Sequence, residues 1–375
     1  MSQSFIPVNE PWLGQREKEL LNECIDTGWI SSEGPFVSRF EKDFSAKMGR
    51  AQGVAVCNGS VAIDVALAAL GVGAGDEVIL PSFTIISCAA AVIRVGATPV
   101  VVDSDPITWN MDVSQIEKKI TAKTKAIMVV HIYGLTVDMD PLMALARKHD
   151  LKVVEDAAEV HGQFYKDKPC GSFGDISTFS FYPNKHITTG EGGMIVMNDK
   201  ALADKCRSLR NLCFVAERRF VHEELGWNYR MSNLQAALGI AQLERLDDAV
   251  KKKRAIGEAY NSRLKNLKGI ETHQIKTEYC ENIYWVYGLV LKDDVGFDAA
   301  EAMKRLAKLG IGTRPFFWPM HEQPVFKKMG LFKNEKHPVA ERLARRGFYL
   351  PSGLALTDDQ IDRASEALIA VMSGS

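Results

Sequence analysis

The chain has 375 residues, of which 46% are hydrophobic and 25% are charged, and its formal net charge at pH 7 is −1. These values are typical of a globular protein with one large and one smaller domain or two similar domains. The near-zero charge argues against nucleic acid or a membrane surface as a partner. No segment approaches the roughly 18 apolar residues of a membrane-spanning helix, and the N-terminus lacks the pattern of a signal peptide.

The seven cysteines form no CxxC pair, and their number is odd. This pattern argues against both a disulfide framework and a metal site. We therefore expect reduced thiols and a cytoplasmic protein.

Apolar runs and helical patterns alternate over the first 200 residues. Residues 60–71 and 140–150 have helical spacing, and the predicted strands are 77–83, 98–105, 125–134, 151–159 and 175–182. This alternation predicts right-handed crossovers and a mostly parallel sheet. The strands are apolar along their length, as a sheet covered on both faces requires.

The pattern changes in the last third of the chain. Residues 232–267 have helical periodicity over a length that suits one helix crossing between two domains. A strand (284–291), a helix (299–310), a turn-rich stretch (314–324) and a final helix (357–372) then predict a small α+β domain. We expect a large domain over residues 1–250 and a small domain over residues 251–375.

Two polar groups lie at expected element ends. Asn58, Gly59 and Ser60 open the helix at 60–71, where free backbone amides could bind an anion, although a plain helix cap is the alternative. Asp156 follows an apolar strand, at the carboxyl edge of the sheet where ligands of open α/β folds bind. Its carboxylate could pair with a cationic ring nitrogen or cap the next helix.

Lys185 follows the strand at 175–182 and precedes a threonine- and glycine-rich turn. Burial there would favour the neutral amine that attacks carbonyl groups, whereas a solvated loop lysine is the alternative. Asn228 and Arg230 precede the long helical segment. A simple helix-entry loop is the alternative to a functional role for these two residues. Pyridoxal phosphate needs a lysine, a carboxylate and a phosphate cradle. The chain offers Lys185, Asp156, and Ser60 with Ser180.

Eight segments strengthen this interpretation because they follow one another over nearly the whole chain: GWISSEGPFVSRFE (28–41), NGSVAIDVALAALGVGAGDEVILPSFT (58–84), GATPVVVD (96–103), KTKAIMVVHIYG (123–134), EDAAEVHG (155–162), GSFGDISTFSFYPNKHITTGEGGMI (171–195), NYRMSNLQAALG (228–239) and TRPFFWPMH (313–321). They resemble the sugar aminotransferases of the DegT/DnrJ/EryC1/StrS type. This resemblance implies an α/β, aspartate-aminotransferase-like fold of type I. A large pyridoxal phosphate-binding domain with a mostly parallel seven-stranded sheet would precede the smaller C-terminal α+β domain.

The resemblance also implies roles for single residues. Lys185 would form the Schiff base with the cofactor and move a proton, and Asp156 would keep the pyridine nitrogen protonated. Glu159 would lie near the cofactor's 3-oxygen. The phosphate would be held by Gly59, Ser60, Ser180 and, from the second subunit of a homodimer with shared active sites, Asn228.

The sequence departs from the family pattern at Ile85, where relatives often have an aromatic residue stacked on the pyridine ring. The aliphatic Ile85 can still cover the ring, and Phe83 is an alternative source of an aromatic contact. His321 would lie at the substrate mouth, and Arg230 or Arg314 would bind an anionic group of the substrate.

The retained lysine implies amine transfer from L-glutamate to a keto sugar. The pattern is closest to the perosamine synthases, which act on a GDP-linked 4-keto-6-deoxymannose. A free 3-deoxy-octulosonate oxidised at carbon 8 is an alternative acceptor, and a non-catalytic binding or regulatory protein is the alternative of another class.

Overall fold

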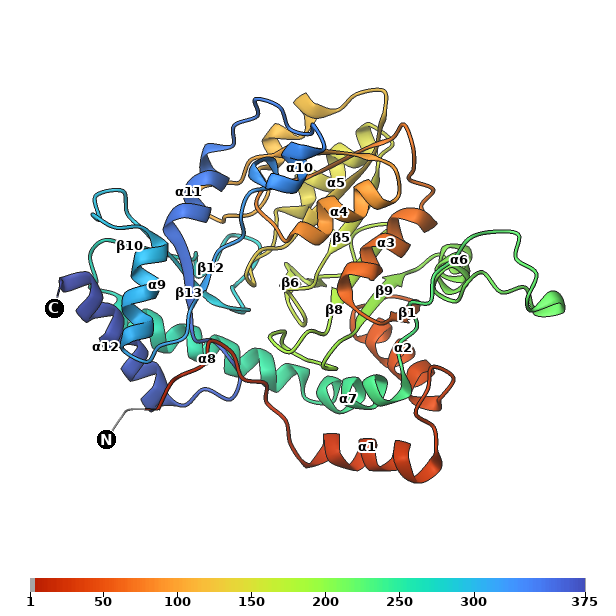
Figure 1. The fold of residues 1–375 in the computed structure, drawn as a ribbon, viewed down its shortest axis with the longest axis horizontal. Helices are drawn as coiled ribbons and strands as arrows, with labels where there is room; N and C mark the ends of the chain where they lie inside the picture. The colour runs from red at the N-terminus through yellow and green to blue at the C-terminus, as the bar shows by residue number, and fades with distance from the viewer. Residues whose placement is uncertain (1–3, 375) are drawn as a thin grey trace.

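The computed structural model describes residues 4–374 (Figure 1). A seven-stranded sheet forms its first part. In spatial order the strands are β1 (Gln52–Val56), β9 (Gly193–Met197), β8 (Ile176–Ser180), β5 (Lys152–Asp156), β4 (Thr124–Val130), β2 (Glu77–Pro81) and β3 (Thr98–Val102). Strand β9 is antiparallel to both of its neighbours, and the other pairs are parallel. The expected fold class, a mostly parallel sheet, is confirmed.

All five predicted strands exist, with ends that differ by a few residues from those expected. The prediction omitted β1 and β9, which pair with each other at one edge of the sheet. Both are five residues long, and β9 follows the glycine-rich turn after Lys185, where periodicity carries little signal.

Helices cover both faces of the sheet, as the continuous apolar strands predicted. One face packs against α3 (Gly59–Ala69), α4 (Ile86–Arg94) and α6 (Lys200–Arg210). The other face packs against α1 (Gln15–Thr27), α2 (Pro35–Lys47), α5 (Met139–Lys148) and α7 (Asn233–Leu243). Short elements complete this part: 3₁₀ turns η1 (Val113–Gln115), η2 (Glu117–Lys119) and η3 (Ala216–Arg218), and hairpin strands β6 (Phe164–Tyr165) and β7 (Lys168–Pro169).

The single helix expected over 232–267 is wrong, because the segment forms α7 and a separate helix α8 (Leu246–Leu264). Arg245 between them has non-helical dihedral angles (φ −122°, ψ 21°). Its guanidinium bonds the Glu17 carboxylate and the Trp12 carbonyl, which fixes the break. The segment still crosses between the two parts of the chain, as expected, because α7 packs on α1 and α2 whereas α8 packs on the C-terminal helix α12 (Figure 1).

A second, antiparallel sheet follows α8. Its order is β10 (Ile270–Thr272), β11 (Tyr287–Leu291), β13 (Gly347–Leu350) and β12 (Arg314–Pro315). Helices α8, α9 (Ala299–Lys308) and α12 (Asp358–Ser373) share its apolar core. The remaining elements are η4 (Met320–Glu322), α10 (Pro324–Lys328) and α11 (Pro338–Arg346).

The N-terminal segment packs on this second sheet. Ile6 exchanges backbone hydrogen bonds with Gly310 and Gly312, each at 2.8 Å, and Val8 accepts one from Ser352. The division at residue 250 falls inside α8 and stays a prediction. None of the helices within residues 4–374 has the length and apolar character needed to cross a membrane.

Candidate active site

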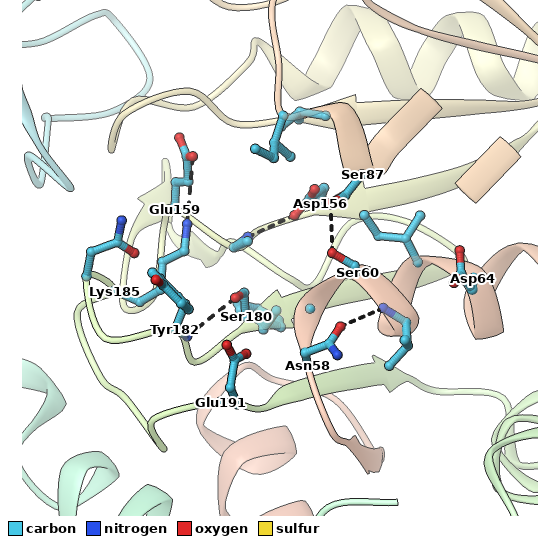
Figure 2. A pocket seen from close by; sticks show the side chains of 18 of the residues that line it. Asn58, Ser60, Asp64, Ser87, Asp156, Glu159, Ser180, Tyr182, Lys185 and Glu191 are labelled. Carbon is cyan, nitrogen blue, oxygen red and sulfur yellow. Dashed lines mark hydrogen bonds and ion pairs between the residues drawn. The ribbon is translucent and has the colours of Figure 1, made fainter. Parts of the chain in front are cut away.

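A pocket of about 840 Å³ lies where β5 and β8 end and α3 begins (Figure 2). This is the edge of an open α/β sheet at which ligands bind. The volume lies in the upper part of the range for small-molecule sites. Residues of the first sheet and of its helices line one part of the pocket, and Trp285, Phe317 and Tyr349 from the C-terminal part of the chain line another, which we call the C-terminal wall.

The start of α3 forms an anion cradle. The Asn58 side-chain oxygen accepts a hydrogen bond from the Val61 N–H at 3.0 Å, so the expected cap exists. Gly59 and Ser60 line the pocket, and first-turn amides have no acceptor within their helix. A Cβ at Gly59 would lie 2.5 Å from the Cβ of Ser180, so glycine is required for this close approach. The free amides and the positive helix end favour a phosphate.

Asp156 is the last residue of β5 and is buried. One carboxylate oxygen accepts a hydrogen bond from the Ala158 N–H at 3.1 Å, and the other accepts one from the Cys88 thiol at 3.4 Å. Burial raises the pKa of Asp156, while the Ala158 N–H and the Lys185 charge oppose this shift. A cation bound beside Asp156 would therefore stabilise its ionised form.

Lys185 reaches into the pocket from the loop after β8, and its side chain is only 10% exposed. Its Nζ lies 3.7 Å from Oε1 of Glu159 and 3.8 Å from the centre of the Trp285 ring. Burial lowers the pKa of the Lys185 amine, although the carboxylates of Glu159 and Asp156 oppose the shift. The alternative of a solvated loop lysine is therefore wrong.

Glu159 lies beside Lys185 in Figure 2 and accepts a hydrogen bond from the Tyr133 N–H at 2.9 Å. Burial raises the pKa of the Glu159 carboxyl, and the Lys185 charge opposes this shift. Ile85 precedes α4, lines the pocket and is 42% exposed. Phe83 is fully buried and is not among the lining residues, so it offers no aromatic face to the pocket.

These groups fit pyridoxal phosphate. The cradle at Gly59 matches a phosphate, Asp156 matches a protonated ring nitrogen, and the desolvated Lys185 amine matches the group that bonds to the cofactor carbonyl. All of them line one pocket, with Ser180 between the cradle and the lysine (Figure 2). The combination predicted from the sequence is thus brought together in space.

Comparison with known proteins agrees with this fit. A family model described as the DegT/DnrJ/EryC1/StrS aminotransferase family matches residues 11–369. The chain belongs to this family. It is a pyridoxal phosphate-dependent transaminase, with the architecture expected from the resemblance.

Three similar proteins illustrate the family. GDP-perosamine synthase from Escherichia coli O157:H7 is 44% identical over 97% of this chain and 98% of the relative. The putative pyridoxal phosphate-dependent aminotransferase EpsN from Bacillus subtilis is 37% identical over 97% and 95%. The solved structure of DesI in the presence of its TDP-sugar product has a TM-score of 0.90 and 30% identity, covering 99% of this chain and 94% of that one.

The residues expected to bind substrate lie elsewhere in this aminotransferase. Arg230 bonds Asn211 and lines a separate pocket of about 240 Å³. Arg314 is exposed on β12, where it pairs with Tyr349 of the main pocket. His321 is buried, with Nδ1 2.8 Å from Ser82 Oγ and Nε2 3.0 Å from Glu341 Oε1. None of the three lines the main pocket of the described chain, and their substrate roles stay predictions.

Asn228 is also outside the main pocket. It forms an isolated bridge with Asn211 and is exposed. This position is compatible with the expected contact to a second subunit, which stays a prediction.

Sequence reasoning missed several pocket residues. Phe317 belongs to the turn-rich stretch 314–324, which also contains the substrate candidates Arg314 and His321, whereas Trp285 and Tyr349 gave no comparable signal. The Asp64 carboxylate is bound by the Arg94 guanidinium, with Nη2 2.6 Å from Oδ1, on the facing helices α3 and α4. The other missed residues that line the pocket are Val61, Ile63, Ser87, Val130, Ala158, Phe179, Tyr182, Asn184, Glu191 and Tyr229.

Proposed function

We propose that this protein transfers the amino group of L-glutamate to a nucleotide-linked keto sugar resembling GDP-4-keto-6-deoxymannose, for surface polysaccharide synthesis. The observation that carries the reaction is the desolvated Lys185 amine facing Asp156 and the anion cradle in one pocket. The 44% identical GDP-perosamine synthase supports the acceptor, and the structure of DesI in the presence of its TDP-sugar product supports a nucleotide-linked sugar.

Different residues of the chain have different roles in this reaction. Pyridoxal phosphate, when bound, supplies a carbonyl that bonds to amines and a ring that accepts electrons. The cradle at Gly59 and Ser60 holds the phosphate, and Asp156 keeps a proton on the ring nitrogen. The pKa of Lys185 is lowered by burial, so its Nζ can take a proton from the donor's α-carbon and return it at the acceptor carbon.

The C-terminal wall provides the surface for the sugar. Phe317 and Tyr349 line the same pocket as the polar groups. Flat aromatic faces with few polar contacts suit sugar rings. The same wall limits the access of water to the Lys185 amine.

A panel of keto sugars tests the acceptor, with glutamate as donor and the purified protein loaded with the cofactor. The nucleotide-linked 4-keto-6-deoxy sugar should give the highest kcat/KM. A free 8-oxo 3-deoxy-octulosonate at equal or higher kcat/KM would overturn the acceptor assignment. No turnover with any keto sugar would contradict the proposed function.

We further propose a homodimer in which each subunit supplies Asn228 to the other subunit's pocket. The segment around η3 projects from the body of the molecule in Figure 1. It exposes Phe220 by 81% and Leu225 by 93%, and it leads directly to Asn228. Such apolar surface on a projecting segment favours a protein contact. The cytoplasmic location stays a prediction.

Mixing two inactive variants, Lys185→Ala and Asn228→Ala, tests the shared site. After subunit exchange, half of the dimers contain one of each variant, and one of their two sites is intact. Activity should return to about a quarter of the wild-type value. No recovery after confirmed exchange would exclude the shared site.

A further inference from the structure

Trp285 contacts the reactive lysine in two ways. The face of its ring lies 3.8 Å from the Lys185 Nζ. Its indole N–H donates a 2.8 Å hydrogen bond to the backbone carbonyl of Asn184, the residue directly before Lys185. One side chain thus contacts both the amine and the backbone that carries it, and it does so from the C-terminal wall of the pocket.

The backbone of Trp285 is held in place by Lys253. The Lys253 Nζ donates a 2.7 Å hydrogen bond to the Trp285 carbonyl and a second one to the Ser352 carbonyl. Lys253 lies on α8 and is fully buried. A buried ammonium group is stable only where such acceptors are fixed. The position of the Trp285 backbone is therefore tied to the helix that connects the two parts of the chain.

We propose that Trp285 is a positioning residue for Lys185, which fixes the amine through its ring face and fixes the preceding peptide through its indole N–H. This inference rests on the proposed role of Lys185 as the amine that reacts with the cofactor. It assigns to the C-terminal wall a part in the chemistry, in addition to contact with the sugar.

The physical basis is the attraction between an ammonium group and an aromatic face, which acts within about 6 Å and is strongest for tryptophan. Lysine has four rotatable side-chain bonds, and holding its amine in one place removes the entropic cost of finding the reactive geometry. The charged or titratable groups that interact electrostatically with the Lys185 amine are Asp156, Glu159, Cys88, His161, His186 and Lys253. Trp285 adds an uncharged contact that favours the ammonium form.

Two variants of similar volume isolate the ring face. Trp285→Phe keeps an aromatic face, whereas Trp285→Met removes it, and both lose the indole N–H. Competitive labelling of the cofactor-free protein with trace acetic anhydride at several pH values, read by mass spectrometry, gives the pKa of the Lys185 amine. The exposed Lys200 serves as internal reference. The pKa should be lower in Trp285→Met than in Trp285→Phe by about 0.5 to 1.5 units.

Fluorinated tryptophan at position 285 keeps the shape and the N–H and weakens the ring's negative face. The pKa of Lys185 should then fall with each added fluorine, even if Trp285→Met does not fold. Equal pKa values across the fluorinated series would overturn the proposed ring contact.

The indole N–H is tested by comparing the cofactor-loaded wild type with Trp285→Phe. Loss of the bond to Asn184 should lower kcat several-fold with little change in the glutamate KM, whereas an unchanged kcat would overturn that half of the proposal. Borohydride reduction of the cofactor-loaded wild type distinguishes a failure of the proposed function from a failure of the proposed role of Trp285. Absence of a cofactor label on Lys185 would sink the proposed function itself, whereas a label together with a flat fluorine series would sink only the role of Trp285.

Discussion

The two walls of the pocket differ in both chemistry and origin. The first wall carries Asp156 and Ser180, the last residues of β5 and β8, and Lys185 in the loop after β8. The second wall presents aromatic faces from Trp285, two residues before β11, and Tyr349, near the end of β13, which lie at the same end of this antiparallel strand pair. The first wall is set by local order along the chain, whereas the second exists only after the two sheets pack together. This difference predicts that substitutions in the two walls will affect different steps.

The largest effect should follow Lys185→Ala, which removes both the bond to the cofactor and the proton carrier. We expect kcat to fall at least about a thousandfold, the scale for losing a nucleophile and a general base together. The matched control in the other wall is Phe317→Leu, which should mainly raise the acceptor KM. Steady-state kinetics of both variants would contradict this division if Lys185→Ala kept substantial turnover.

Asp156→Asn should have the next largest effect, because it removes the carboxylate that stabilises a protonated ring nitrogen. Losing one partner of a buried charge pair costs about 2–5 kcal/mol, so we expect kcat to fall at least about thirtyfold. The cofactor should stay bound, which its visible absorbance will report. Near-normal kcat in this variant would mean that another carboxylate serves the ring.

Arg314→Met should give a smaller effect, confined to the acceptor. Arg314 is paired in register with Tyr349 of the aromatic wall. Loss of a charge-assisted contact to an anionic acceptor should raise its KM about tenfold, while the glutamate KM stays the same. Equal changes in both KM values would assign Arg314 to the donor carboxylate or to the fold. If neither changes, Arg230 becomes the better candidate for the anion.

The smallest effect on activity, but a clear effect on stability, should follow His161→Phe behind the polar wall. Neither ring nitrogen of His161 has a hydrogen-bond partner among the described residues, and the aromatic rings of Phe44, Phe179 and Phe181 surround it. Burial lowers the pKa of His161 from 6.5 to about 3. Below pH 6.5 the unfolded chain therefore binds a proton that the folded chain does not.

The wild-type free energy of unfolding should consequently fall by up to about 1.4 kcal/mol per pH unit through His161 as the pH drops from 6.5 towards 3. His161→Phe should remove this contribution, as measured by urea unfolding at several pH values. The exposed His222→Phe serves as control. An equal pH dependence in wild type and His161→Phe would contradict the buried neutral state.

The polar wall could be predicted from the sequence because each of its groups lies at the end of an apolar strand or at the start of a helix. Lys185, Asp156 and Gly59 needed only the strand order to come together. Trp285 could not be placed in this way, since it lies a hundred residues after Lys185 and is held by Lys253 on another element. The break at Arg245 was also missed, because its cause is a contact with Trp12, before α1, and with Glu17 in the first turn of α1.

The resemblance to a family allowed the cofactor to be predicted from the sequence, but it did not predict which residues line the pocket on the substrate side. Arg230, Arg314 and His321 lie outside the pocket that Lys185 lines. Side chains that act across a subunit boundary or after domain packing leave no periodic signal in one chain. Their assignment depends on the acceptor and on the proposed second subunit.

The most direct test of the central claim is to load the protein with pyridoxal phosphate, reduce it with borohydride and map the modified peptide by mass spectrometry. The account predicts a pyridoxyl phosphate group on Lys185 in the peptide containing FSFYPNK, with loss of the visible absorbance on reduction. A label on another lysine, or no label although the cofactor is bound, would contradict the assignment of Lys185 as the reactive residue.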